Sequence, residues 1–122
     1  MRKFLLALAA LLAILPMSAK QIGVDEAKEL VNRFVRENSR LKSLASGGDI
    51  TLAYTEATNA VANYYVYNLA QGGFVIVSAD DCVEQVLGYS ENGSFDINTA
   101  PENMLSMLEG YKQEINYAIT HS

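Results

Sequence analysis

The sequence of 122 residues contains a single cysteine, Cys82, a single histidine, His121, and no tryptophan. One cysteine excludes a disulfide framework within the chain. A catalytic cysteine needs a base nearby, normally a histidine, and His121 stands one residue from the end of the sequence, so we expect no catalytic Cys–His pair. Zinc sites draw on several Cys and His ligands, and we expect neither a metal nor another cofactor. The residues argue by exclusion against an enzyme, and Cys82 receives no role.

The acidic residues and the glycines point to no chemistry either. Asp80-Asp81 supplies oxygen atoms but does not follow the spacing of a calcium-binding loop. Gly72-Gly73 separates two predicted strands, where a hairpin turn explains it without a bound phosphate. Glu84, Glu91 and Asp96 could meet in space as general acids and bases, but no spacing favours that over solvated surface charge.

Positive charge is scarce, because nine lysines and arginines face fourteen aspartates and glutamates, for a formal net charge of −5. Arg2 and Lys3 stand before an unbroken apolar run, Phe4–Leu15, and the segment 16–19 follows with Pro, Met, Ser and Ala. This order is typical of an export signal, and the apolar run is too short for an ordinary transmembrane helix. We predict a signal peptide at residues 1–19 and a single domain at residues 20–122.

Removal of residues 1–19 would leave seven basic residues against fourteen acids, a net charge of −7. An acidic domain without a basic cluster is a poor candidate for binding nucleic acid or an anionic membrane surface. We therefore expect a protein partner and no stable membrane insertion after signal removal. The domain is predicted to be exported to the periplasm, the cell surface or the medium, and to be a monomer when free.

Hydrophobic periodicity predicts a helix at each end of this domain. Val24–Asn38 has apolar residues at helical spacing and charged residues on the other side. The last helix begins at Pro101, where a helix tolerates proline, and its apolar stripe continues to Ile119. Gly110 lies inside that helix, at a cost of about 1 kcal/mol relative to alanine. Residues 39–49 end in a Ser-Gly-Gly sequence that stops a helix, and we interpret them as a connection.

Between these helices the sequence predicts strands. Ile50–Ala57 alternates, with Ile50, Leu52 and Tyr54 assigned to one face of a half-buried strand, and residues 58–63 are taken as a link. Tyr64–Leu69 and Phe74–Ala79 flank a Gly-Gly turn and form a hairpin, whose second strand is apolar on both faces apart from Ser78 and is therefore central. Val86–Tyr89 is a further strand. The order predicts an α+β fold, an antiparallel sheet of about four strands with an N-terminal and a C-terminal helix packed against it.

Several sequence blocks occur in a fixed order in the second half of the chain: Tyr65-Val66-Tyr67-Asn68, residues 72–80 (GGFVIVSAD), residues 87–90 (LGYS), residues 93–96 (GSFD), and Glu102-Asn103. In this order they resemble the propeptide of streptopain-type, papain-clan cysteine proteases and the related standalone propeptide-like inhibitors. The resemblance is strongest from Tyr65 to Asn103 and weak before Asp49. Separate blocks in one order make a specific match.

The resemblance implies a function and a site. In that family the propeptide keeps a papain-like protease inactive by covering its active-site cleft. An asparagine near the start of the last helix enters the site and displaces the catalytic histidine, and the matching residue here is Asn103. An asparagine offers a neutral donor and acceptor but cannot serve as a general base. The protease-binding residues that this implies are Phe95, Asp96, Pro101, Glu102, Asn103 and Met104.

One departure from the family shapes the expected function. A streptopain zymogen continues into a catalytic domain, whereas this sequence ends at Ser122. We therefore expect an exported inhibitor that acts in trans on a streptopain-like cysteine protease. Three other interpretations stay open: a non-inhibitory propeptide-like folding assistant, a small exported binding module with a tyrosine-lined sheet face, and Asn103 as an ordinary first-turn residue of a surface helix.

Overall fold

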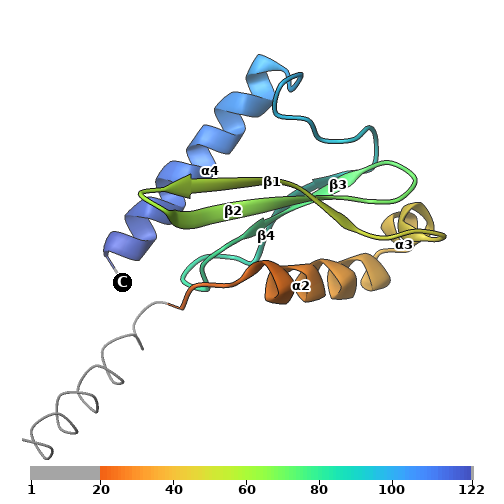
Figure 1. Ribbon diagram of the computed structural model, residues 1–122, viewed down its shortest axis with the longest axis horizontal. Helices are drawn as coiled ribbons and strands as arrows, with labels where there is room; N and C mark the ends of the chain where they lie inside the picture. Colours follow the sequence, from red (N-terminus) through yellow and green to blue (C-terminus); the bar gives the residue numbers. More distant parts are fainter. Residues whose placement is uncertain (1–19, 122) are drawn as a thin grey trace, which may run out of the picture.

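The computed structural model describes residues 20–121, whose four-stranded antiparallel sheet lies between two helical layers (Figure 1). One layer contains α2 (Val24–Glu37) and α3 (Ser39–Ala45), and the other contains α4 (Glu102–Thr120). The strands, β1 (Thr51–Thr58), β2 (Val61–Asn68), β3 (Phe74–Ser78) and β4 (Val86–Ser90), lie side by side in sequence order. This arrangement confirms the predicted α+β fold. The predicted signal peptide at residues 1–19 lies outside the described residues.

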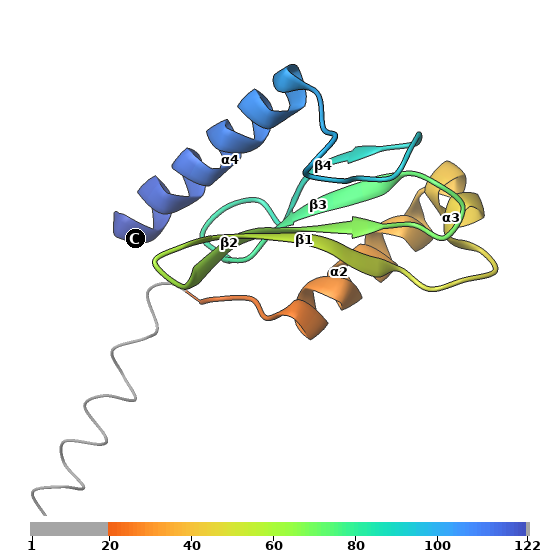
Figure 2. The ribbon, with the colours of Figure 1, turned by 45° about the horizontal axis from the view of Figure 1, so that its top comes forward.

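Both faces of the sheet are buried, each under its own helix (Figure 2). The α2 side buries the tyrosines Tyr65 and Tyr67 together with apolar residues of α2. The α4 side buries Tyr64 and Val66 together with Leu108 and Ile115 of α4. Alternate residues of β2 thus enter opposite cores, as the period-two pattern predicts. Every residue of β3 is buried, which confirms that this strand is central.

The predicted face of β1 is wrong beyond Leu52, because the strand contains a β-bulge. Leu52 pairs with Tyr67, but Tyr54 pairs with Val66, so one residue of β1 is left over between them. A bulge inserts one residue into a strand and thereby exchanges the two faces that follow. Ile50 therefore belongs to the core on the α2 side, and Tyr54 packs against the core on the α4 side.

Residues 58–63, predicted to be a link, instead form a tight hairpin turn. β1 continues through Thr58, and β2 starts at Val61. Asn59 and Ala60 between them have φ values of 51° and 66°. Positive φ at both central residues is what a two-residue type I′ turn requires. The alanine gave no turn signal, because alanine rarely adopts this conformation.

Residues 39–49, interpreted as a connection, contain the short helix α3. Asn38 caps it, since its side-chain oxygen accepts hydrogen bonds from the backbone N–H groups of Arg40 and Leu41. Leu41 is fully buried against the α2 side of the sheet. A helix this short is marginal by itself, so its cap and its buried leucine, rather than a periodic pattern, account for it.

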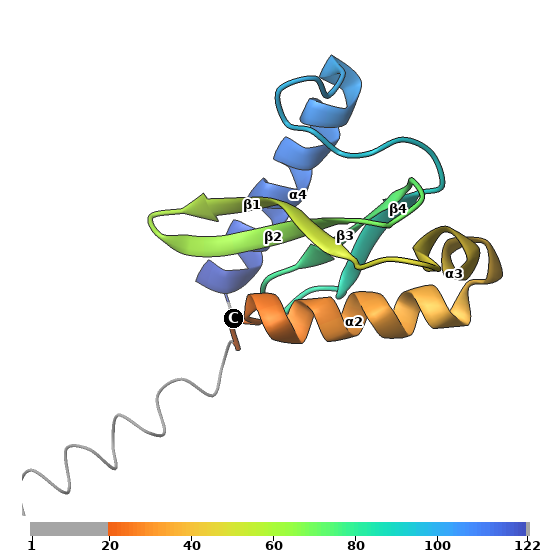
Figure 3. The ribbon, with the colours of Figure 1, turned by 45° about the vertical axis from the view of Figure 1, so that its right-hand side comes forward.

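The C-terminal half of α4 is fixed to the β1–β2 hairpin by polar contacts. The Thr58 hydroxyl donates to Asn63 Oδ1 at 2.8 Å, Asn63 Nδ2 donates to Asn116 Oδ1 at 2.7 Å, and Asn116 Nδ2 donates back to Thr58 Oγ1 at 3.1 Å. Lys112 Nζ of α4 also lies 3.1 Å from Glu56 Oε1 of β1. The first turns of α4 stand farther from the sheet than this anchored half (Figures 1 and 3).

Candidate functional site

The segment between β4 and α4, residues 91–101, carries the predicted site and is held against the turn between β2 and β3. The Gly73 N–H donates to the Gly93 carbonyl at 2.6 Å. Gly73 has a φ of 89°, and a Cβ there would lie 2.7 Å from the Ser90 carbonyl oxygen. Only glycine fits at this close approach. The Gly-Gly turn therefore closes the hairpin and also fixes the start of the segment.

Phe95 holds the middle of the segment in the core. Its ring is 5% exposed and lies 5.9 Å from the ring of Tyr54 and 5.7 Å from that of Phe74. The Asn68 side chain bonds both backbone groups of Phe95, accepting from its N–H at 2.8 Å and donating to its carbonyl at 3.2 Å. The structure thus places Phe95 as an anchor. Sequence reasoning missed Asn68, whose one signal was a polar side chain on a buried face of β2.

Asp96 organises the turn that follows. Its carboxylate accepts a hydrogen bond from the Asn98 N–H at 2.9 Å, and its carbonyl accepts one from the Thr99 N–H at 3.1 Å. A side-chain carboxylate that bonds the N–H two residues on forms an Asx turn. Asp96 is exposed, and its carboxylate sets the direction in which the chain approaches α4.

The remaining predicted residues, 101–104, form the exposed beginning of α4. Pro101 is the N-cap residue rather than the first helical residue, and its carbonyl accepts the Leu105 N–H at 3.0 Å. Glu102 places a negative charge in the first turn, where the helix dipole stabilises it. The Asn103 side chain is exposed and forms no hydrogen bond with any part of the chain that the structure describes. Met104 is half-buried and packs against the core on the α4 side.

The structure therefore separates the six predicted residues into two groups. Phe95 and Asp96 shape the segment from within, whereas Pro101, Glu102 and Asn103 stand together at the free end of the helix, with Met104 behind them. The protease-binding roles of all six stay predictions.

A charged network on the β1 side of α4 shifts several pKa values. The Tyr54 hydroxyl donates to Glu56 Oε2 at 2.5 Å, and this hydrogen bond, with burial, raises the pKa of Tyr54 to about 12. The same bond, assisted by Lys112, lowers the pKa of Glu56. Glu56 therefore favours its carboxylate form, and its contact with Lys112 joins β1 to α4.

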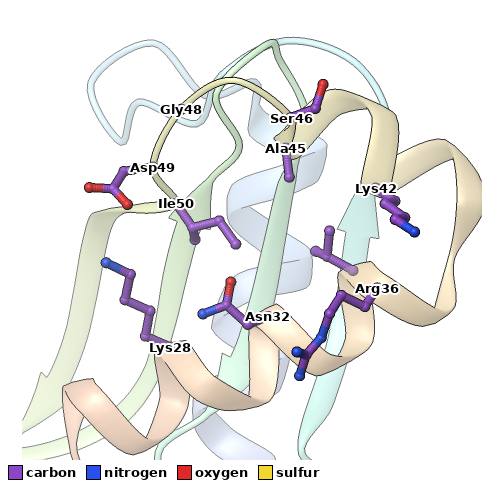
Figure 4. Close-up of a pocket in the computed structure, with 10 residues that line it drawn as sticks. Lys28, Asn32, Arg36, Lys42, Ala45, Ser46, Gly48, Asp49 and Ile50 are labelled. Atoms are coloured by element: carbon purple, nitrogen blue, oxygen red, sulfur yellow. The ribbon is translucent and has the colours of Figure 1, made fainter.

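The opposite helical layer contains a pocket that holds none of the predicted residues (Figure 4). It has a volume of about 310 Å³ and lies between α2, α3 and the start of β1. Lys28, Arg36 and Lys42 stand on different sides of it rather than converging on one point (Figure 4). Cations that do not converge build no defined anion site, and we assign this pocket no ligand.

Cys82 is a half-buried free thiol, and His121 lies in an exposed position just after α4. Burial, together with the neighbouring Asp80, raises the pKa of the Cys82 thiol to about 11, whereas a nucleophilic cysteine has a lowered pKa. His121 stacks on Tyr117, with ring centroids 3.9 Å apart. Within residues 20–121, no three metal-binding side chains are grouped to hold an ion. Among the helices of the same range, none is both long and apolar enough to cross a membrane.

Comparison with known proteins places the chain in a protein family. Residues 19–115 match the sequence model of a family described as Spi protease inhibitor. Streptopain of Streptococcus pyogenes is 38% identical over 117 residues, which cover 91% of this chain and 29% of streptopain. The thiol protease/hemagglutinin PrtT of Porphyromonas gingivalis is 30% identical over 118 residues, which cover 94% of this chain and 14% of that protein. The chain thus spans less than a third of the length of these relatives.

Proposed function

The chain belongs to the Spi protease inhibitor family, and from this membership we propose that it inhibits a streptopain-like cysteine protease by covering the active-site cleft. The support is its similarity to the streptopain propeptide region. An inhibitor of this kind needs a binding surface rather than a catalytic group. It is expected to bury about 1,200–2,000 Å² with its target.

One observation carries the proposal. The Asn103 side chain is exposed, forms no hydrogen bond within the residues that the structure describes, and follows a segment, residues 91–101, that is fixed to the sheet. Binding loses less conformational entropy when the binding residue is already in place. The contacts of Gly93, Phe95 and Asp96 fix the chain up to the first turn of α4. Asn103 then offers an amide donor and acceptor to polar groups of the protease, but it does not replace a histidine as a base.

The test is a titration of residues 20–122 against mature streptopain and against PrtT. We expect a stoichiometric loss of peptidase activity with at least one of them. Asn103→Ala should weaken inhibition about tenfold or more, as for a central interface residue, without changing thermal stability. Asn32→Ala, in α2 on the other side of the sheet, is the matched control and should inhibit like the wild type.

The outcomes separate the candidate functions. Binding without loss of activity would favour a folding assistant, and absence of binding to both proteases would exclude this proposal. If Asn103→Ala inhibits as strongly as the wild type, then Asn103 is not the inserted residue.

We propose further that residues 20–122 act outside the cytoplasm, as a monomer, after removal of residues 1–19. The basic start and the apolar run of the sequence support export. Mass spectrometry of the protein recovered from culture would show whether the chain begins at Lys20.

A further inference from the structure

Asn103 does not stand alone on α4, because three exposed residues continue its face of the helix. Met107, Gly110 and Glu114 follow Asn103 at positions i+4, i+7 and i+11, and residues at this spacing lie on one side of a helix. All four are exposed, and 42% of Met107 is accessible. We call these four residues the α4 stripe.

Two depressions adjoin the α4 stripe. The first, of about 380 Å³, lies between α4 and strands β3 and β4, and Met104, Met107 and Tyr111 line its helical side. The second, also of about 380 Å³, follows α4 and is lined by Met107, Gly110 and Tyr111 together with Gln113 and Glu114. Both include Met107 and Tyr111, so the two depressions are neighbours along α4, and we refer to the pair as the hollow beside the stripe.

The base of this hollow is fixed by a hydrogen bond, and flexible methionine side chains form part of its walls. The Tyr111 hydroxyl donates to the Leu87 carbonyl at 3.0 Å and so fixes α4 above β4. Gly88 has no side chain, and a Cβ there would lie 3.3 Å from the Tyr111 hydroxyl oxygen. Methionine side chains, such as those of Met104 and Met107, are flexible and polarisable and fit partners of varied shape. The hollow is therefore suited to receive side chains of another protein.

Gly110 also indicates a contact surface on α4, because the fold does not need a glycine at this position. It lies within α4, has no positive φ, and a Cβ at this position would meet no atom within 4 Å. An alanine would stabilise the helix, since glycine is the poorest helix former after proline. A glycine that costs stability and leaves an open hollow is what close approach of another protein requires.

The charge of the α4 surface indicates the charge of the protein that would bind there. Residues 20–45 contain six lysines and arginines and four acids, whereas residues 46–121 contain one basic residue and ten acids. That one basic residue, Lys112, is paired with Glu56. Glu102, Glu109 and Glu114 of α4 form no ion pair within the described part of the chain. Of these, Glu114 lines the hollow and Glu102 is next to Asn103, so unpaired negative charge stands near both ends of the α4 stripe, whereas Glu109 lies near Lys112 on another side of the helix.

We propose that the α4 stripe and its hollow are a docking surface for the protease, which inserts an apolar protrusion flanked by lysine or arginine residues. The inference rests on the proposed function and extends it from Asn103 to a surface along about three further turns of α4. A second copy of this chain is the less suitable occupant, because two acidic α4 surfaces repel each other.

Gly110→Leu tests the docking surface. The variant fills the hollow from an open position, so we expect it to unfold at an equal or higher temperature than the wild type. We also expect its affinity for mature streptopain with a blocked catalytic cysteine, measured by calorimetry, to fall at least about tenfold. Ser43→Leu adds the same side chain to an exposed position of α3, on the other side of the sheet, and should bind like the wild type.

The same measurements separate this inference from the proposed function. If the wild type binds the blocked enzyme but does not inhibit the active one, the proposed function fails, and weaker binding of Gly110→Leu still supports the docking surface. If Gly110→Leu binds and inhibits like the wild type, the docking surface is excluded while inhibition through Asn103 stands. A wild type that binds neither form of the enzyme excludes both proposals. An effect of Gly110→Leu on self-association alone, seen by sedimentation, would assign the surface to a second copy and overturn the inference.

The charge of the partner is tested by association kinetics. Attraction between unlike charges speeds association and is screened by salt. We expect the association rate with streptopain to fall between low and high ionic strength, and the fall to become smaller when Glu102 and Glu114 are both replaced by glutamine. A rate that is independent of salt for the wild type would exclude the basic flanks of the protrusion.

Discussion

Four asparagines of this domain have the same side chain and opposite roles. Asn63, Asn68 and Asn116 each use the amide oxygen and the amide nitrogen in hydrogen bonds with other segments. Asn103 uses neither group within the residues that the structure describes. The first three join strands, loop and helix, and the fourth remains available to a partner. Position relative to the sheet, and not residue type, separates the two roles.

Asn68 helps to fix the position of residues 91–101, because its side chain bonds both backbone groups of Phe95. Asn68→Ala would leave the Phe95 N–H and carbonyl without their partners, and such a loss costs about 1–3 kcal/mol. We expect a lower unfolding temperature and weaker inhibition, although Asn103 itself is unchanged. Asn68→Asp still accepts from the Phe95 N–H, so its unfolding temperature should lie between those of the wild type and Asn68→Ala. Inhibition by Asn68→Ala at wild-type strength would show that the segment keeps its position without this contact.

At the scale of elements, the two halves of α4 differ. The C-terminal half is anchored to the sheet, and the N-terminal half carries exposed side chains. The closed ring of Thr58, Asn63 and Asn116 and the pair of Lys112 with Glu56 lie toward its C-terminal half. The first turns carry exposed Asn103 and Met107. Because the anchoring contacts lie in the C-terminal half of α4, the first turns stay accessible while the direction of the helix is fixed.

The anchoring ring provides a test at this scale. Asn116→Ala would leave the amide of Asn63, a fully buried side chain, without the acceptor for its nitrogen. A buried amide nitrogen without an acceptor lowers the free energy of unfolding by about 1–3 kcal/mol. Each 1 kcal/mol lowers the unfolding temperature by about 4–8 °C in a domain of this size. Gln113→Ala, an exposed change on the same helix, is the control for calorimetry. Equal unfolding temperatures for the two variants would contradict a stabilising role for the ring.

Elements differed in how far their sequence predicted them. The tyrosines of β2 and the apolar run of β3 were assigned correctly, because alternation over a strand depends on neighbouring residues alone. The face of Tyr54 was wrong because a bulge arises from the pairing of β1 with β2. α3 was missed because Leu41 stabilises it through burial against residues far away in the sequence.

At the scale of the whole molecule, both cores contain tyrosine hydroxyl groups at their edges. Burial raises the pKa of Tyr64 and, to about 12, that of Tyr67, and the pKa of Tyr54 is also raised to about 12. In the unfolded chain these groups ionise near pH 10. Because the folded-state pKa values are higher, the stabilisation is complete below about pH 10 and is lost as the pH rises through the folded values.

This linkage predicts alkaline unfolding. We expect the free energy of unfolding from urea titrations to begin to fall at about pH 9, where the Cys82 thiol ionises in the unfolded chain, and to fall more steeply above about pH 10 as the tyrosines ionise there. Tyr67→Phe should make the fall less steep, because one group no longer ionises on unfolding. Equal stability at about pH 8 and pH 11.5 would show that the three hydroxyl groups are not protected in the folded protein.

The sequence by itself determined the types of the main elements and the family, and it predicted Asn103 as the residue that enters a protease active site. These depend on local periodicity and on the order of short blocks. Only the tertiary structure decided that Phe95 is a buried anchor and that Met107 and Tyr111 of α4 line depressions next to the sheet. Those properties arise where β2, β4 and α4 meet, and contacts between segments distant in the chain leave no periodic trace in any one of them.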